Sequence, residues 1–277
     1  MSENPATVRT EKTLFDVLRD IWAARIAMLV TGFAGFAVAF TFVTLARPYY
    51  RAEMILAPAS PIGQGGFQLP TLPDRMLWQS QSVQNYPNFM KFENKFNAPS
   101  VAGLLLEDEK IVRGLILDQT FDFIAPEVSW TPEKLSRYLT RSVRLEPVGN
   151  TPLRKLVYLH PDRNFAAYLI ERVHQITDTL IRQTLRLETQ ERIAYLHESL
   201  SKTVNPEHRR ALADLLMEQE RLKMLVSMDQ PYAASIVEPA SSSVKPDWPD
   251  PRFVFPAFIL IGFFLGFVIY GIFYLHD

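Results

Sequence analysis

The feature that most constrains this chain is a pair of long stretches without a charged residue, one near each end of the sequence. The first covers residues 26–46 and follows Arg25, and the second covers residues 253–275 and follows Arg252. A helix crosses the roughly 30 Å hydrocarbon core of a bilayer in about 20 apolar residues. Because every backbone N–H and C=O group in lipid must bond within its own segment, both stretches are predicted to be transmembrane helices.

Two other interpretations of these stretches are weaker. A buried helix of a soluble core seldom extends over about twenty residues without one charge. A secretory signal peptide has an apolar region of about 7–15 residues, and the small-residue motif Ala37-Val38-Ala39 lies inside the first stretch instead of after it. Both segments are therefore expected to remain in the protein as membrane anchors.

The rest of the chain has the composition of a soluble domain. All 29 basic and 30 acidic residues lie outside the two stretches. About 25% of the remaining residues are therefore charged, which is the usual share for a globular domain. Residues 47–252 are predicted to form this domain between the anchors. Two spans place both termini on one side of the membrane and this domain on the other.

Basic residues before the first span indicate on which side of the membrane the N-terminus lies. They are Arg9, Lys12, Arg19 and Arg25. By the positive-inside rule such a flank is cytoplasmic, and the absence of cysteine suits an oxidising compartment on the other side. We therefore expect a membrane protein with two spans, a cytoplasmic segment over residues 1–25, a domain over residues 47–252 that faces the periplasm if the chain is bacterial, and a cytoplasmic tail over residues 276–277.

The cytoplasmic segment has an amphipathic pattern of its own. Its apolar residues recur at helical spacing, opposite Asp16, Arg19 and Asp20, and they are Leu14, Val17, Leu18, Ile21 and Trp22. Such a helix next to a span is expected to lie along the membrane surface. Binding of a cytoplasmic partner is the alternative.

Small residues in both spans predict close packing of the two helices. They are Gly32, Gly35 and Ala39 in the first span and Gly262 and Gly266, which form a GxxxG motif, in the second. In lipid, small side chains let helix backbones approach each other. Pro256 is placed in the first turn of the second helix, where the missing N–H group costs little. Neither span carries an acidic or basic residue, which argues against an ion path through the chain.

Alternating patterns and turn residues predict the strands of the middle domain. The first strand is expected over residues 51–57, and a loop rich in proline and glycine over residues 58–73 follows it. Residues 143–147 and 156–159 are predicted to form a β-hairpin around a Gly-Asn turn. A last strand is expected over residues 234–237.

Helical periodicity and capping residues predict the shorter helices. Phe89, Phe92 and Phe96 recur at helical spacing and are expected in the core. Ser100 is the expected N-cap of a helix that ends at Leu106, and the acidic residues 107–109 after it are expected to form a solvated face. The Thr131-Pro132 pair is a strong signal for the start of another helix.

Two long helices, over about residues 162–202 and 206–228, are predicted to form a helical hairpin. His160-Pro161-Asp162 precedes the first helix, and Asn205-Pro206 separates it from the second. At 1.5 Å per residue the first would reach about 60 Å. The predicted fold is an α+β membrane protein in which two transmembrane helices flank a periplasmic α+β domain with a long helical hairpin arm.

Prolines are concentrated before the second span. Pro239, Pro246, Pro249 and Pro251 all lie between the last predicted strand and the span. This density favours an extended, stiff connection, which would set the distance between the sheet and the membrane. A connector without such a role is the alternative.

The residues of catalysis and metal binding do not occur in their usual patterns. None of the histidines has a metal-ligand spacing such as HExxH; they are His160, His174, His197, His208 and His276. The sequence contains no nucleophile elbow of the GxSxG type. The middle domain carries 25 basic and 25 acidic residues, and this balance argues against nucleic acid as a partner. We therefore predict no catalytic residue, metal or cofactor, and the chain is not expected to be an enzyme.

Four parts of the sequence, taken in order, resemble the chain-length determinant (Wzz-type) polysaccharide co-polymerases. They are TLFDVLRDIWAARIAMLV at residues 13–30, the Tyr49-Tyr50-Arg51-Ala52-Glu53 start of the first strand, His160-Pro161-Asp162 followed by Ala166-Ala167, and the stretch from Pro246 to Pro256 before a glycine-bearing span. The resemblance covers both ends and the sheet-forming pieces. The helical arm is shorter than in typical members.

The resemblance implies an inner-membrane homo-oligomer that forms a bell-shaped ring in the periplasm and regulates the length or export of a surface polysaccharide without forming bonds itself. The implied partners are other copies of the chain, the polysaccharide polymerase or export machinery, and the surface glycan or its lipid-linked precursor. The residues that would contact a glycan are left open. A two-span periplasmic sensor or adaptor subunit of another membrane complex is one alternative, and an ectoenzyme acting on a glycan or lipid is another.

Overall fold

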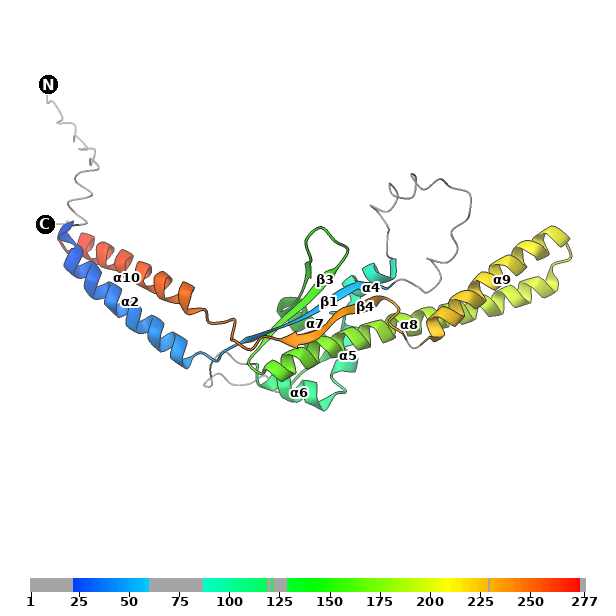
Figure 1. Ribbon diagram of the computed structural model, residues 1–277, viewed down its shortest axis with the longest axis horizontal. Helices are drawn as coiled ribbons and strands as arrows, with labels where there is room; N and C mark the ends of the chain where they lie inside the picture. Colours follow the sequence, from blue (N-terminus) through cyan, green and yellow to red (C-terminus); the bar gives the residue numbers. More distant parts are fainter. Residues whose placement is uncertain (1–21, 60–86, 119–120, 122–128, 229, 275–277) are drawn as a thin grey trace, which may run out of the picture. The chain divides into compact units, whose positions relative to one another are not determined.

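The computed structural model describes residues 22–59, 87–118, 121, 129–228 and 230–274 (Figure 1). The expected amphipathic residues before Trp22, the loop from residue 60 onward and the tail over residues 276–277 lie outside these described residues. The chain divides into two compact units. One is a helix pair made by the two ends of the chain, and the other is a domain of mixed helix and sheet between Tyr49 and Asp247.

Helices α2 (Arg25–Leu45) and α10 (Pro251–Tyr274) lie side by side in the first unit (Figure 1). Both are long and apolar enough to cross a membrane, and only 11% of the apolar window of each helix is buried. The core helix of a soluble protein would be mostly buried. The exposed apolar surface of these two helices therefore supports a membrane protein.

The position expected for Pro256 is wrong. The side chain of Asp250 accepts a hydrogen bond from the N–H group of Arg252 at 2.9 Å, so α10 begins at Pro251, two residues before the predicted span. Pro251 is the proline of the first turn, and Pro256 lies inside the helix. Because proline has no N–H group, the carbonyl group of Arg252 lacks its usual helical partner.

The second unit contains a four-stranded antiparallel sheet with the order β2-β3-β1-β4. Its strands are β1 (Tyr50–Pro58), β2 (Val143–Pro147), β3 (Arg154–His160) and β4 (Ala234–Ser242). The predicted β2–β3 hairpin is confirmed, with Val143 opposite Tyr158. Its turn contains Gly149 at a φ of 59°, which glycine adopts without a steric cost.

Strand β4 is longer than the sequence suggests. We expected Pro239 in the connection after the strand, but β4 continues through it to Ser242. Proline is tolerated in a sheet on edge strands and at bulges, and both conditions hold here. β4 is an edge strand, and the pairing register with β1 shifts between the pairs Glu53–Ser241 and Ile55–Glu238, which places Pro239 in the irregular part.

Short helices complete the domain: α4 (Pro87–Lys95), α5 (Pro99–Leu105), α6 (Glu109–Ile116) and α7 (Pro132–Ser142). The helix start at Thr131 is confirmed, since its hydroxyl accepts the N–H group of Lys134 at 3.3 Å. Ser100 is not the N-cap that we expected. That position belongs to Ala98, because Pro99 takes the first helical position and places Ser100 already within the first turn.

Helices α8 (Arg163–Lys202) and α9 (Pro206–Ser227) form a long hairpin (Figure 1). Asp162 caps α8 by accepting the N–H groups of Asn164 and Phe165, at 2.8 and 3.3 Å. The first half of α8 packs on the sheet. Beyond Ile181 its buried residues are only Thr189, Ile193 and Leu196. We call α8 beyond Ile181, together with α9, the helical arm.

The core lies between one face of the sheet and the helices. The inward side chains of β1 are Ala52, Met54 and Leu56, and those of α8 include Leu169, Ile170 and Val173. The predicted phenylalanine stripe is confirmed as part of this core, since Phe89, Phe92 and Phe96 are 4%, 0% and 7% exposed. The root of the helical arm is thereby anchored on the sheet.

Candidate functional site

Asp178 and Arg182 together hold the two ends of the connection between the helical arm and the sheet. Asp178 lies on α8 with only 4% of its side chain exposed. Its carboxylate oxygens accept the N–H group of Tyr232, at 2.9 and 3.1 Å, and that of Ala233, at 2.7 Å. Arg182, one turn further along α8, donates to Asp178 at 3.0 Å and to the carbonyl oxygen of Met228 at 3.2 Å. We call Asp178 and Arg182 the root clamp.

His174 extends these contacts by one helical turn. Its ring is 3% exposed, and its Nε2–H group donates to the carbonyl oxygen of Ala234 at 2.8 Å. The ring also lies against Phe92, with centroids 5.6 Å apart. Nδ1 has no hydrogen-bond partner in the described part of the chain. Residues 174, 178 and 182 follow each other at a spacing of four, so one side of α8 binds the start of β4.

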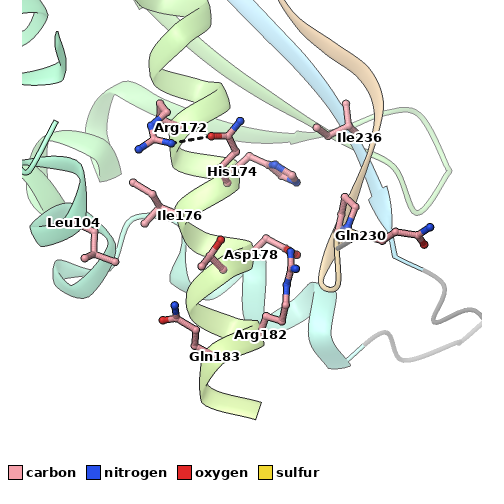
Figure 2. Close-up of a pocket in the computed structure, with 12 residues that line it drawn as sticks. Leu104, Arg172, His174, Ile176, Asp178, Arg182, Gln183, Gln230 and Ile236 are labelled. Carbon is pink, nitrogen blue, oxygen red and sulfur yellow. Dashed lines mark hydrogen bonds and ion pairs between the residues drawn. The ribbon is translucent and has the colours of Figure 1, made fainter. Parts of the chain in front are cut away.

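A groove of about 580 Å³ surrounds the root clamp (Figure 2). Its polar lining comes mostly from α8 and consists of Arg172, His174, Gln175, Asp178, Thr179, Arg182, Gln183 and, from the segment before β4, Gln230. Leu104, Ile176, Pro231 and Ile236 supply apolar patches. The volume falls within the range of about 300–1,000 Å³ typical of small-molecule sites.

The chemistry of this groove is hydrogen bonding. The guanidinium of Arg172 donates to the side-chain oxygen of Gln175 at 2.9 Å, as the dashed line in Figure 2 shows. Amides offer both donors and acceptors, so the exposed glutamines suit a ligand rich in hydroxyl groups. Asp178 is the one carboxylate among the described lining residues, and the root clamp already uses both of its oxygens. The part of the lining that the structure describes therefore offers no carboxylate pair for general acid–base catalysis.

Asp108 corrects the expectation of a solvated acidic face. Its carboxylate caps α6 by accepting the N–H group of Lys110 at 3.0 Å, and it accepts the hydroxyl of Tyr168 at 2.5 Å. Arg172 lies 3.5 Å away. The hydrogen bond from Tyr168 lowers the pKa of Asp108 below its ordinary value. Asp108 thus joins α6 to α8 behind the groove, whereas Glu109 is exposed, as predicted.

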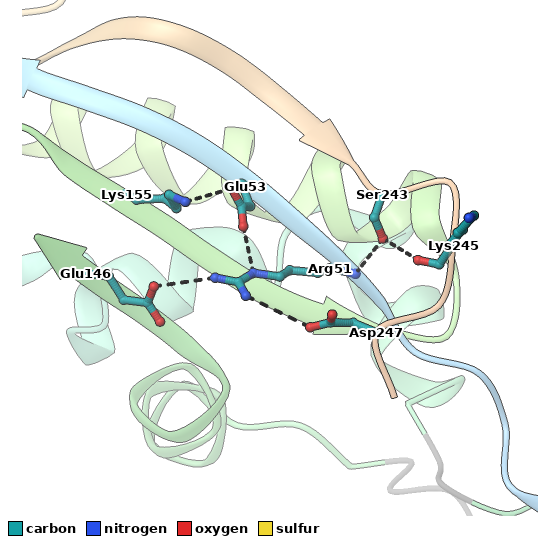
Figure 3. A network of polar contacts seen from close by, with 7 residues as sticks. All are labelled: Arg51, Glu53, Glu146, Lys155, Ser243, Lys245 and Asp247. Atoms are coloured by element: carbon teal, nitrogen blue, oxygen red, sulfur yellow. Dashed lines mark hydrogen bonds and ion pairs between the residues drawn. The ribbon is translucent and has the colours of Figure 1, made fainter. Parts of the chain in front are cut away.

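Arg51 is the centre of a polar network on the other face of the sheet (Figure 3). It lies 2.7 Å from Glu53, 3.4 Å from Glu146 and 4.0 Å from Asp247. Lys155 completes the network at 3.0 Å from Glu53. One cation thereby connects β1 with β2 and with the segment that follows β4.

Backbone bonds attach that segment to the start of β1. The N–H group of Ser243 donates to the carbonyl oxygen of Arg51, and that of Asp247 to the carbonyl oxygen of Tyr49, both at 2.8 Å. The hydroxyl of Ser243 donates to the carbonyl oxygen of Lys245 at 2.7 Å. The chain before Pro246 is therefore held to the strand that follows α2 in the sequence.

The four prolines expected in a membrane-proximal segment do not share one environment. Pro246 and Pro249 lie between β4 and α10, and the peptide bond before Pro249 is cis. Pro251 is the first residue of α10, and Pro256 is inside it. That these prolines set a distance to the membrane remains a prediction.

The small residues of the two apolar helices lie where the helices meet. A Cβ atom on Gly262 would clash with the carbonyl group of Thr31, and one on Gly35 would clash with the carbonyl group of Phe258. Gly266 lies against the backbone at Met28. Gly32 faces the ring of Phe263, and Ala39 is fully buried. A role for these residues in holding the spans together in a membrane is proposed below.

Two buried polar clusters support the fold near α7 and β3. The hydroxyl of Tyr138 donates to Asp118 at 2.5 Å and lies 2.6 Å from that of Tyr158. Burial raises the pKa of both tyrosines well above the ordinary value. His160 is fully buried, with Nε2 3.1 Å from the carbonyl oxygen of Gly114, and burial lowers its pKa.

The remaining histidines of the described region do not gather around a common point. His160 and His174 are in the core, whereas His197 and His208 are exposed on the helical arm. Within the described ranges, no group of three or more histidine, aspartate or glutamate side chains is arranged to hold a metal ion. His276 lies outside the described residues.

The root clamp and the Arg51 network were missed in the sequence. Asp178 carries the signal that could have found the first. It interrupts the apolar face of α8 between Val173 and Ile181, where an unpaired carboxylate would be costly. For Arg51 the signal was weaker, because a charge on the outward face of a strand is common.

Comparisons with known proteins give a structural likeness but no match in sequence. No family model matches the sequence, and no curated protein matches it. Among solved structures the chain is similar to a full-length bacterial polysaccharide co-polymerase, with 13% sequence identity and a TM-score of 0.40, over 93% of this chain and 96% of that chain. Neither the sequence identity nor the TM-score assigns the chain to a family.

Proposed function

We propose that this chain is a non-catalytic polysaccharide co-polymerase of the bacterial inner membrane, which regulates the chain length or export of a surface polysaccharide as a ring-like homo-oligomer. The order of elements along the chain carries the proposal. The Tyr49–Glu53 motif begins β1 after the first apolar helix, and His160–Asp162 forms the step from β3 into α8. The proline-rich stretch leads from β4 into the second apolar helix. These are the places at which the motifs resemble the co-polymerases.

Exposed apolar side chains on the helical arm support self-association. Each is more than half exposed, and they are Leu187, Tyr195, Leu215, Met217 and Met224. A contiguous apolar patch on a soluble domain is typical of an interaction site, and we propose that these side chains belong to one. In the proposed ring, neighbouring copies cover it.

A rigid scaffold needs a fixed direction for its arm, and the root clamp supplies it. Asp178 and Arg182 bind both the last turn of α9 and the start of β4. We further propose that the glycines hold the two spans together by close packing. The stiff segment from Pro246 to Pro251 then sets the distance from the sheet to the bilayer. The domain faces the periplasm with both termini in the cytoplasm, and the polymerase or export machinery and the lipid-linked glycan are its partners.

Deletion of the chain in its own bacterium tests the proposal. The surface polysaccharide is resolved by size on a gel in the wild type, the deletion strain and the deletion strain carrying the gene on a plasmid. We expect the deletion to change the length distribution or the amount of polymer, and the plasmid to restore it. An unchanged polysaccharide profile in the deletion strain would contradict the proposal.

A further inference from the structure

A second groove lies on the helix pair, at the beginning of α2. It has a volume of about 300 Å³ and is lined by Trp22, Arg25, Met28, Leu29 and Phe263. Four of its five described lining residues are apolar, and the guanidinium of Arg25 is the only charged group among them. The groove thus joins one cation to an apolar wall.

The glycines of the helix interface build this wall. The ring of Phe263 occupies the space where a side chain on Gly32 would lie, so it reaches across from α10 to α2. Gly266 lets the backbone of α2 at Met28 approach α10. As a result, Met28 and Phe263 form one continuous apolar surface instead of two separated helix faces.

Arg25 lies at the end of this apolar surface, where its guanidinium can bind an anion. Its guanidinium carbon lies 5.1 Å from the centroid of the Trp22 ring, and both side chains are exposed. Within the described part of the chain, no carboxylate is in ion-pair distance of Arg25. Tryptophan and arginine are the residues that favour the headgroup level of a bilayer, with apolar residues continuing toward its centre.

We propose that this groove binds an anionic phospholipid, with the phosphate at Arg25 and the upper part of an acyl chain along Met28, Leu29 and Phe263. The chemistry of the lining decides the occupant. The guanidinium binds phosphate oxygens, and its positive charge favours a headgroup with a net negative charge over a zwitterionic one. The apolar wall matches a hydrocarbon chain but offers nothing to a free phosphate ion or a hydrophilic peptide. The proposal rests on the membrane placement in the proposed function and is independent of any role in glycan assembly.

Native mass spectrometry of the full chain tests this site. The protein is reconstituted in bilayers of equal parts phosphatidylglycerol and phosphatidylethanolamine, and the lipids that stay bound after release are counted. We expect selective retention of phosphatidylglycerol, and Arg25→Gln should reduce it about fivefold, the equivalent of about 1 kcal/mol for one basic residue at a membrane surface. Arg252→Gln is the matched control, because Arg252 is exposed on α10 outside the groove.

A steric variant distinguishes lipid binding in the groove from a nonspecific attraction of anionic lipid to the positive charge. Leu29→Trp fills the groove and keeps Arg25, so it should also lower the retention of phosphatidylglycerol. Equal retention of both lipids by the wild type, or equal losses in Arg25→Gln and Arg252→Gln, would overturn the proposal and indicate unselective annular lipid. Flotation of the reconstituted protein with vesicles is measured in parallel; a chain that does not float would instead contradict the membrane placement.

Discussion

Replacing Asp178 with alanine removes the acceptor that holds the start of β4 against α8. The two oxygens of this carboxylate accept the N–H groups of Tyr232 and Ala233 at 2.7 to 3.1 Å, and 4% of the side chain is exposed. Alanine offers no replacement, so the buried N–H group of Ala233 and the partly buried one of Tyr232 lose their partner. Arg182 loses an ion pair at the same time.

The size of the effect follows from these contacts. A buried donor left without an acceptor costs about 1–3 kcal/mol, and removing one partner of a buried ion pair costs about 3–5 kcal/mol. Arg182 is 24% exposed and keeps its bond to the carbonyl group of Met228. We therefore expect a loss near the lower end, about 3–4 kcal/mol. In a domain of this size that lowers the melting temperature by about 6–16 °C.

The assay is thermal unfolding of the full chain in mild detergent, followed by circular dichroism, with Asp214→Ala as the control because Asp214 is exposed on α9. Hydrogen exchange at the amides of Tyr232 and Ala233 should accelerate in Asp178→Ala and stay unchanged in the control. A melting temperature within about 2 °C of the control would refute the reasoning.

Three further predictions concern the helix pair, the core and the Arg51 network. Gly262→Leu should force α10 away from Thr31, at a cost of about 1–3 kcal/mol. Cysteines introduced at Phe36 and Phe255, whose rings lie 5.3 Å apart, should then be cross-linked less efficiently by a short bifunctional maleimide, whereas Leu260→Phe on the exposed face should preserve the cross-link. Burial lowers the pKa of His160, so the unfolded chain takes up this proton first and stability should decrease as the pH falls below ~6.5. His160→Gln should flatten that decline in urea unfolding, and an unchanged slope would count against it. Arg51→Gln should cost less than about 1 kcal/mol, because Arg51 is one-third exposed; a loss of about 3 kcal/mol would mean that the network is more than a surface feature.

Local signals predicted the elements whose ends depend on neighbouring residues. Thr131 and Asp162 cap their helices through bonds to N–H groups two or three residues later, and Gly149 supplies the turn of the β-hairpin. Each of these contacts is contained in a short stretch of sequence. A pattern of residue types is therefore enough to find it.

Two of the errors arose where residues far away in the sequence decide the structure. Pro239 usually ends a strand, and only its place on the sheet edge, next to a register shift, lets β4 continue to Ser242. Asp108 looked like part of a solvated acidic run, yet its hydrogen-bond partner Tyr168 is 60 residues later. The start of α5 was misplaced for a local reason, because Pro99 competes with Ser100 for the first turn.

The candidate site could be predicted only in part. The spacing of the small residues predicted close packing of the spans, and Gly35 and Gly262 lie where α2 and α10 meet; that they hold the spans together in a membrane stays a prediction. The root clamp joins Asp178 to backbone groups 54 and 55 residues away, and no repeat or motif in the sequence connects these positions. To predict the root clamp, one would have had to know the path by which the chain returns from α9 to the sheet.

The mass of the detergent-solubilised complex tests the central claim most directly. In the proposed function the protein is a scaffold that works as a ring of identical subunits, each of 31.8 kDa. Native mass spectrometry of the purified full chain should therefore show one dominant species at a large multiple of that mass, without another protein. A monomer, or a stable complex with a different protein in place of further copies, would contradict it.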